Sequence, residues 1–322
     1  MAGGGALAAC AVAVLALAGG PGVAAGPVRH AAGPPADGPA LDRMALAPAD
    51  LPPGSVVRRE GYVRDKSFSA YYVREFAPGA RIGFARLSSL ESDVGLAATS
   101  ADAERLAAAA RAALRTRSGR RGFARSALAD AGWDSKGLTI TFGGFRTVAA
   151  GDSASLATMT LSLPGRRRFS LVLGFVRVER ALQLLDVFGS PNARIAQADV
   201  AALVGIVAQR MRAGLIPVAT AAPSVSGVAQ EGQVLTAEPG AWTNAPASFA
   251  VQWLRCDQAA AHCVAIDGAT GTTYLLTAAD VGASLEVSVV ATNGAGSSPP
   301  AVSAPTTAVM PAASSRVSPL ER

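Results

Sequence analysis

The chain has 322 residues, enough for two domains that each bury a core. Half of the residues are hydrophobic but only 5% are aromatic, and no apolar run beyond the N-terminus approaches the ~20 residues of a membrane-spanning helix. The formal net charge is +6, and because residues 223–309 hold six acidic residues against one basic, the positive excess lies upstream. This excess either attracts an anionic partner or solvates the surface.

The N-terminal segment has the features of an export signal. Residues 6–18, ALAACAVAVLALA, form an apolar run of signal-peptide length, followed by helix-breaking Gly and Pro and by small residues suited to cleavage. We therefore predict a signal peptide over residues 1–25. An uncleaved anchor is the alternative, because no Lys or Arg lies beside Met1. Residues 26–43 are rich in Pro, Gly and Ala, which predicts a disordered linker.

The segment 44–216 shows the pattern of an α+β domain. Its order of elements, three strands, a helix, three strands and a helix, predicts an antiparallel sheet with two helices packed against it. Ser100 is the expected N-cap of the first helix. The predicted strands cover residues 56–63, 70–76, 82–90, 138–148, 154–163 and 169–178, and the predicted helices cover residues 101–114 and 196–213.

The middle domain lacks the residues on which most catalytic chemistry depends. Between Met44 and Ile216 there is neither His nor Cys, which excludes Cys nucleophiles, His general bases and the common transition-metal sites. We expect no catalytic residue, no metal and no cofactor. A carboxylate pair could still serve a glycan-acting enzyme, although no motif singles out a pair. The carboxylates concerned are Glu60, Asp65, Glu75, Glu91, Asp93, Asp130, Asp134 and Asp152.

Two arginine clusters in predicted loops are candidate anion contacts. They are Arg120 with Arg121, and Arg166, Arg167 and Arg168. Arginine binds phosphate and carboxylate groups through two parallel hydrogen bonds, so an anionic wall polymer or another envelope protein is the expected partner. The alternative is a solvated hairpin tip. We expect no nucleic acid partner, and contact with a membrane only through an uncleaved N-terminus.

The segment 223–309 has the pattern of an all-β sandwich. Gly, Pro and Asn punctuate short runs, and alternate residues of two runs are apolar. In the first run these residues are Phe249, Val251 and Trp253, and in the second they are Leu285, Val287 and Val289. These two runs should be core strands that face the same interior.

The stretches PSVSGVAQEGQVLTAEPGAWTNAPASFAVQWLRC and AIDGATGTTYLLTAADVGASLEVSVVATNGAGS resemble the immunoglobulin-like repeats of actinobacterial and related secreted or cell-surface proteins. The resemblance spans nearly the whole segment. It implies that Trp253 is the core tryptophan of the third strand, and that Asp280 and Gly282 form the corner before the strand with Leu285. It also implies a display or adhesion role. Antibody-type recognition is not implied, because the inter-sheet disulfide of antibody domains is absent.

Cys256 and Cys263 flank the sequence DQAAAH, within reach of each other across a hairpin. In an exported chain this spacing predicts a disulfide, worth somewhat under ~3 kcal/mol in the chain-entropy model. The alternative is a metal site that includes His262, but tetrahedral zinc needs a fourth ligand that the spacing does not supply. Residues 310–322 are expected to form a disordered tail.

Together these features predict a noncatalytic, exported or extracytoplasmic protein of the bacterial envelope. Its middle domain would bind a partner, and its C-terminal domain would act as a display or adhesion module. A carboxylate-dependent enzyme acting on envelope glycans and a purely structural envelope component are the alternatives.

Overall fold

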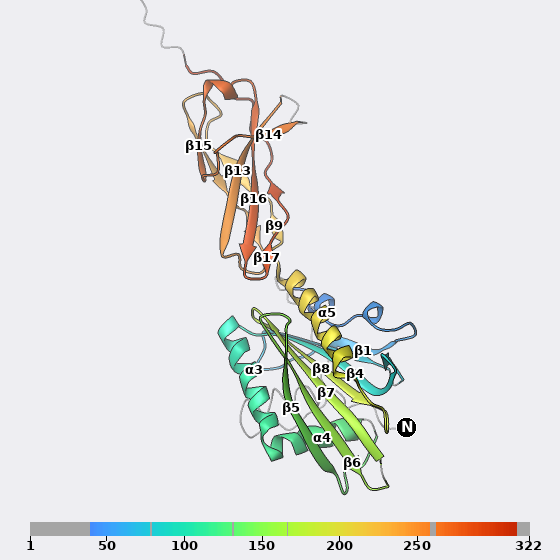
Figure 1. The fold of residues 1–322 in the computed structure, drawn as a ribbon. Coiled ribbons are helices and arrows are strands. Elements are labelled where there is room, and N and C mark those ends of the chain that lie inside the picture. The colour runs from blue at the N-terminus through green and yellow to red at the C-terminus, as the bar shows by residue number, and fades with distance from the viewer. Residues whose placement is uncertain (1–38, 78, 131, 166, 258–261, 314–322) are drawn as a thin grey trace, which may run out of the picture. The chain divides into compact units, whose positions relative to one another are not determined.

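The computed structural model describes residues 39–77, 79–130, 132–165, 167–257 and 262–313 (Figure 1). The predicted signal peptide and nearly all of the predicted linker lie outside these ranges. The chain divides into two compact units, the first ending at Gly214 and the second beginning at Leu215. In the part of the chain that is described, no helix combines the length and apolarity needed to cross a bilayer.

The first unit is built on one antiparallel sheet, as the predicted α+β class requires. Its strands follow the order β1-β2-β4-β8-β7-β6-β5, and the short β3 pairs with β4 beside this path. The bounds are β1 (Val57–Tyr62), β2 (Ala70–Phe76), β3 (Arg81–Ile82), β4 (Ala85–Leu96), β5 (Thr139–Val148), β6 (Ser153–Leu163), β7 (Arg167–Val178) and β8 (Ala181–Gly189).

Helices cover both faces of this sheet (Figure 1). On one face, α3 (Ser100–Arg115) and α4 (Arg117–Asp130) bury alanine, leucine and phenylalanine side chains in a core shared with β7 and β8. On the other face lie α5 (Gln197–Leu215) and the short α2 (Leu41–Met44). Gly174 in β7 makes room for α5, because a Cβ there would lie 2.8 Å from Val204 Cγ2.

The structure corrects the predicted N-terminal boundary and helix cap. Leu41 and Met44 of α2 are fully buried, so the linker predicted to reach residue 43 ends before Leu41. Thr99, not Ser100, caps α3, because its side chain accepts a hydrogen bond from the Asp102 backbone N–H. The strand predicted over residues 82–90 is divided between β3 and the longer β4.

Two long elements, β8 and α4, were missing from the predicted order. Strand β8 follows a tight turn in which Glu179 takes a positive φ of 50°, so neither Gly nor Pro marks the hairpin. Helix α4 is rich in arginine and holds Gly119 and Gly122, which made it resemble a loop. It forms because Phe123, Ala124, Ala127 and Leu128 repeat at helical spacing and are buried against the sheet.

The corner between α3 and α4 depends on Thr116 and Gly119. The Thr116 hydroxyl accepts a hydrogen bond from the Gly119 backbone N–H at 3.0 Å, which satisfies an unpaired donor in the first turn of α4. A Cβ at Gly119 would lie only 2.1 Å from the Ala113 carbonyl oxygen. The close approach of the two helices therefore requires glycine here.

The second unit consists of antiparallel sheets around one core, a sandwich-like arrangement. One sheet has the order β10-β11-β15, another has β14-β13-β16-β17 with β18 beside β16, and β9 pairs with β12. Trp253, Leu285, Val287 and Val289 are fully buried in a core shared with Leu235 of β11. The bounds are β9 (Ala219–Ala221), β10 (Ser224–Ser226), β11 (Val234–Glu238), β12 (Ala241–Trp242), β13 (Ser248–Cys256), β14 (Cys263–Ala265), β15 (Thr273–Leu275), β16 (Ser284–Asn293), β17 (Gly296–Ser297) and β18 (Ala301–Val302).

The predicted disulfide is confirmed, and it joins Cys256 to Cys263 across the antiparallel pair β13 and β14. The disordered tail was predicted to begin at residue 310, but Met310 still forms a β-bridge with Gln230. Residues 314–322 lie outside the described ranges.

A matched pair of substitutions tests the helix corner. We expect Gly119→Ala to destabilise the first unit by about 1–3 kcal/mol, the usual cost of overpacking. Gly122→Ala, in the same helix, should stabilise it by about 0.5–1 kcal/mol, because a Cβ there meets no atom within 4 Å and alanine favours helix. Urea unfolding followed by far-UV circular dichroism measures both. Equal effects of the two substitutions would contradict the packing argument.

Candidate functional site

A row of acidic side chains crosses the middle of the first unit's sheet. Glu75 in β2 pairs with Glu91 in β4, and Glu91 pairs with Asp186 in β8. Directly paired residues place their side chains on the same face, with Cβ atoms about 5 Å apart. All three side chains are buried, so the row lies inside the protein on the face covered by α3 and α4.

Asp93 belongs to the same face, two residues beyond Glu91 on β4. Its side chain is 2% exposed, and its Oδ2 atom accepts a hydrogen bond from the Tyr71 hydroxyl at 3.1 Å. Its other oxygen, Oδ1, has no hydrogen-bond partner among the described residues. Asp93 also lines a small cavity of about 20 Å³ between α3 and the sheet, where Ala107, Ala110 and Leu184 are apolar neighbours. That volume suits a water molecule.

Two arginines reach the outer end of this row. The ladder between β1 and β2 has an irregularity between Val57 and Arg59, so that Arg58 and Arg59 both approach Glu75. Arg58 forms a 3.0 Å ion pair with Glu75, and Arg59 lies 3.7 Å from it. The positive charge therefore meets the row at one end, while Glu91 and Asp93 lie deeper.

Burial raises the pKa values of the carboxyl groups of Glu75, Glu91 and Asp93. Loss of water raises the pKa of Glu91 well above its usual range, and the nearby carboxylates of Asp93 and Asp186 raise it further. Burial also raises the pKa of Asp93 strongly, although the hydrogen bond from Tyr71 opposes this. Burial raises the pKa of Glu75 too, against the opposing charges of Arg58 and Arg59. Burial thus favours the neutral forms of Glu91 and Asp93 over their charged forms.

The other carboxylates of the sequence-derived set have local structural contacts. Glu60 pairs with Arg74, and Asp152 pairs with Arg177 and Arg212. Asp65 and Asp134 accept turn hydrogen bonds from backbone N–H groups, and the side chain of Asp130 lies outside the described set. The cavity is lined by one carboxylate, Asp93. The described carboxylates do not form the paired, accessible arrangement that glycan hydrolysis requires.

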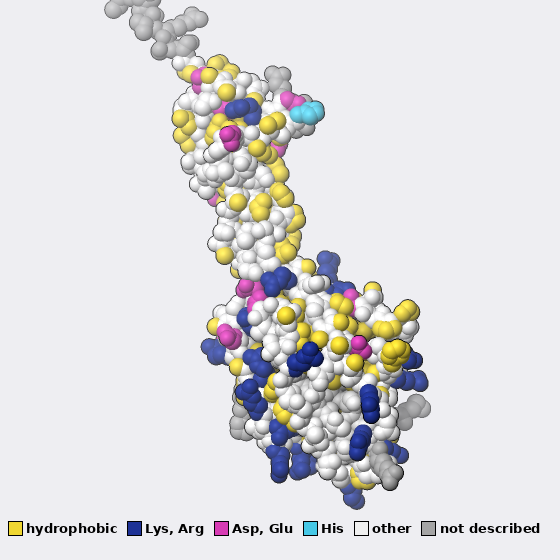
Figure 2. All heavy atoms as spheres, viewed as in Figure 1, with side chains coloured by type: hydrophobic (Ala, Val, Ile, Leu, Met, Phe, Trp, Pro, Cys, Tyr) yellow, Lys and Arg dark blue, Asp and Glu magenta, His cyan; other side chains and the backbone are white. Residues whose placement is uncertain are grey.

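Helix α4 presents a basic stripe to solvent. Arg117, Arg121 and Arg125 are spaced four residues apart, which places them on one side of the helix, and all three are exposed. No described side chain forms an ion pair with them, and α4 has no acidic residue before Asp130. Like charges four residues apart destabilise a helix by about 0.2–0.5 kcal/mol per pair, so helix stability does not account for the stripe. Figure 2 shows Lys and Arg side chains gathered along the edge formed by α3 and α4.

The predicted arginine clusters occupy different places. Arg120 and Arg121 lie in α4, not in a loop; Arg121 belongs to the stripe. The Arg120 guanidinium donates to the carbonyl oxygens of Leu114 and Arg115 at the end of α3 and lies over the Phe142 ring. Arg167 and Arg168 begin β7, where Arg167 lies over Trp133 and Arg168 is exposed. Arg166 lies outside the described residues.

The acidic row and the arginine stripe on α4 were not predicted from the sequence. Asp186 was overlooked because β8 was not predicted, so the acidic row could not be assembled. The stripe was overlooked because spacing by four residues has meaning only on a helix, and α4 was taken for a loop. No protein-family model matches the chain, and a search of curated proteins found no significant match.

Replacing Glu91 tests whether burial raises the pKa of its side chain. A raised pKa means that the folded chain keeps a proton that the unfolded chain releases, so the free energy of unfolding falls as pH rises above the usual carboxyl pKa of 4.5. We expect Glu91→Gln to raise the melting temperature at pH 8, by about 2–4 °C for each kcal/mol regained, with little change at pH 4. Melting curves across this pH range measure the effect.

Glu104→Gln is the matched control for this experiment, because it removes the same charge from an exposed position on α3. If the melting temperatures of Glu91→Gln and Glu104→Gln depend on pH in the same way, the inference that burial raises the pKa of Glu91 is wrong.

Proposed function

We propose that this protein is a noncatalytic, exported component of the bacterial envelope whose first unit binds an anionic wall polymer. The observation that carries the proposal is the exposed stripe of Arg117, Arg121 and Arg125 on α4. Exposed arginines, which here form no ion pair with a described residue, bind phosphate and carboxylate groups through charge-assisted hydrogen bonds. A straight stripe along about two turns of helix fits a linear polymer with repeated negative charges.

The rest of the first unit supports a binding role. Residues 44–216 hold 24 basic and 14 acidic residues, and three of the acidic ones, Glu75, Glu91 and Asp186, are buried in the row. The surface is therefore more basic than the composition suggests, and such a surface steers anions toward it. The enzyme alternative has weaker support, because the carboxylates that come together are covered by helices.

For the second unit we propose an immunoglobulin-like module that displays the first unit or adheres to a partner. The resemblance assigned Trp253 to the core, where its indole N–H donates to the Gly271 carbonyl oxygen at 2.8 Å. It assigned Asp280 to a corner, where the buried carboxylate accepts hydrogen bonds from the backbone of Thr277 and from Arg255. Burial opposes the charge of Asp280, but these hydrogen bonds outweigh it and lower the pKa. Such a fixed corner suits a stable spacer.

Cosedimentation of the full chain with isolated cell wall of the producing bacterium, across a salt series, tests the binding role. We expect binding that weakens with salt, since exposed charges are screened within about 8–10 Å at physiological ionic strength. The triple variant Arg117→Gln, Arg121→Gln, Arg125→Gln should lose about tenfold in affinity or more, because each charged hydrogen bond contributes about 1.5–3 kcal/mol before losses to screening.

The matched control removes three exposed arginines elsewhere in the first unit: Arg64→Gln, Arg81→Gln and Arg194→Gln. It makes the same change in net charge without touching α4, so it should bind nearly as well as the wild type. Equal losses in the two triple variants would show that only overall charge matters. Binding that is insensitive to salt, or no binding at all, would contradict the proposal.

A further inference from the structure

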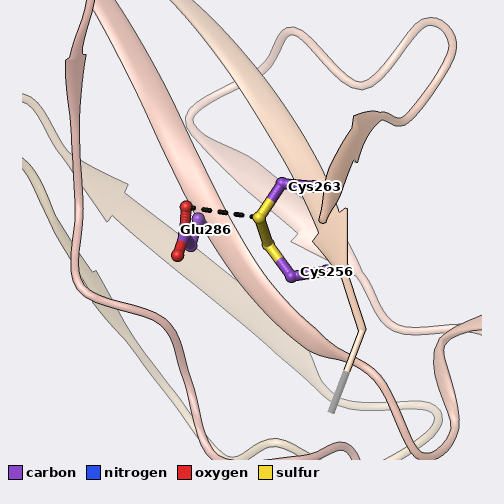
Figure 3. Close-up of side chains that lie close together, drawn as sticks. All are labelled: Cys256, Cys263 and Glu286. Carbon is purple, nitrogen blue, oxygen red and sulfur yellow. Dashed lines mark hydrogen bonds between the residues drawn. A yellow bond between two sulfur atoms is a disulfide. The ribbon is translucent and has the colours of Figure 1, made fainter. Parts of the chain in front are cut away.

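The disulfide of the second unit lies beside an acidic side chain from a neighbouring strand (Figure 3). Cys263 Sγ is 3.6 Å from Glu286 Oε2, and the two sulfur atoms and one carboxylate oxygen all lie within 4.8 Å of one another. No other three Cys, His, Asp or Glu side chains converge as closely in the described part of the chain. Thiolate and carboxylate are both zinc ligands.

The strands hold these three residues in place. Cys256 and Cys263 are directly paired across β13 and β14. Glu286 is on β16, which pairs with the other edge of β13 and places Glu286 opposite Leu254. Ligands that project from paired strands are positioned more firmly than ligands on loops. Glu286 is also the partner that the sequence did not reveal, because it lies 23 residues from Cys263.

The spacing matches a tetrahedral zinc site. Bond lengths of about 2.3 Å to sulfur and 2.0–2.2 Å to oxygen separate a thiolate and a carboxylate ligand by about 3.6 Å. The distance from Cys263 to Glu286 already has this value. The two sulfurs, which are bonded to each other in the disulfide, would have to move apart to about 3.8 Å, which the same bond lengths require. Reduction of the disulfide is therefore the condition for metal binding.

We propose that reduction of the Cys256–Cys263 disulfide opens a zinc site formed by Cys256, Cys263 and Glu286, with water in the fourth position. Two molecules of a low-molecular-weight thiol would reduce the bond. The first attacks one cysteine sulfur, which releases the other cysteine as a thiol and leaves a mixed disulfide. The second attacks the mixed disulfide, which releases the remaining cysteine thiol and one small disulfide. Zinc then displaces both thiol protons to solvent, while Glu286 enters as a carboxylate. The disulfide and the metal thus exclude each other.

His262 is not one of these ligands. Its ring is 87% exposed, and its Nδ1 atom lies 3.0 Å from Asp257 Oδ2. Its ring nitrogens do not belong to the group in which the ligand atoms converge. The site therefore differs from the metal alternative considered for the sequence, in which His262 completed a set of neighbouring residues along the chain.

Metal titration of the full chain tests this site, with Cys10→Ser in every sample so that Cys10 contributes no thiolate. The protein is reduced with a phosphine, and zinc affinity is measured by competition with a chromophoric chelator. Cadmium reports the thiolates through their charge-transfer absorbance. We expect one zinc per reduced chain and none per oxidised chain. Glu286→Gln should weaken zinc binding at least tenfold, since loss of even an outer partner costs about 10–100-fold.

Two variants control the titration. Glu238→Gln removes an exposed glutamate from β11 and should bind zinc as the wild type does. The double variant Cys256→Ser, Cys263→Ser lacks the disulfide in every condition and should bind no zinc, and tryptophan fluorescence, to which the buried Trp253 contributes, shows whether its core remains folded. The proposal is overturned if the reduced wild type binds no zinc, if Glu286→Gln binds as tightly as Glu238→Gln, or if the double serine variant binds.

Discussion

Over residues 90–96, strand β4 is paired on both edges and buried on both faces, and this constraint decides where the polar side chains of that segment can lie. Its partners are β2 and β8, with α3 and α4 over one face and α5 with α2 near the other. Alternate residues of a strand point to opposite faces, so every polar residue here must find a partner inside the protein. Ser92, on the face toward α2, does so by accepting hydrogen bonds from Gln183 and from the Leu46 backbone.

On the opposite face the same constraint produces the acidic row. The side chains of Glu75, Glu91 and Asp186 are buried, and Glu75 forms ion pairs with Arg58 and Arg59 at the end of the row. Burial of an ionised carboxylate is costly, and this cost raises the pKa of Glu91 and of Asp93. Ionisation of these groups therefore costs stability as the pH rises through their raised pKa values. No described carboxylate forms an ion pair with Arg117, Arg121 or Arg125 on α4.

The sequence predicted those parts of the fold in which local pattern and tertiary context agree. The strands over residues 70–76 and 154–163 alternate or carry β-branched and aromatic residues, and they appear as β2 and β6. Helix α3 follows its alanine-rich composition. Trp253 and its neighbours followed a two-residue period, which identifies a strand with one covered face. In these segments the secondary structure could be predicted without information about residues that are distant in the sequence.

The errors came where tertiary packing overrides local preference. Glu179 adopts a left-handed conformation normally reserved for glycine, so the turn into β8 carries no sequence signal. In α4, two glycines lower the helix propensity and four arginines make the segment look like an exposed loop. The helix forms because Phe123 and Leu128 are buried. Both errors affected the candidate sites directly, because β8 supplies Asp186 and α4 supplies the stripe.

The cysteine pair shows how far spacing along the chain can determine a site. The sequence was sufficient to predict the disulfide, because two cysteines across a short hairpin need only each other. A metal site needs a further ligand, and in a sheet that ligand comes from whichever strand pairs beside the hairpin. The pairing of β13 with β16, set by the apolar alternation of Trp253 with Val287, is what places Glu286 next to Cys263. The core packing of one face thus fixes the chemistry available on the other.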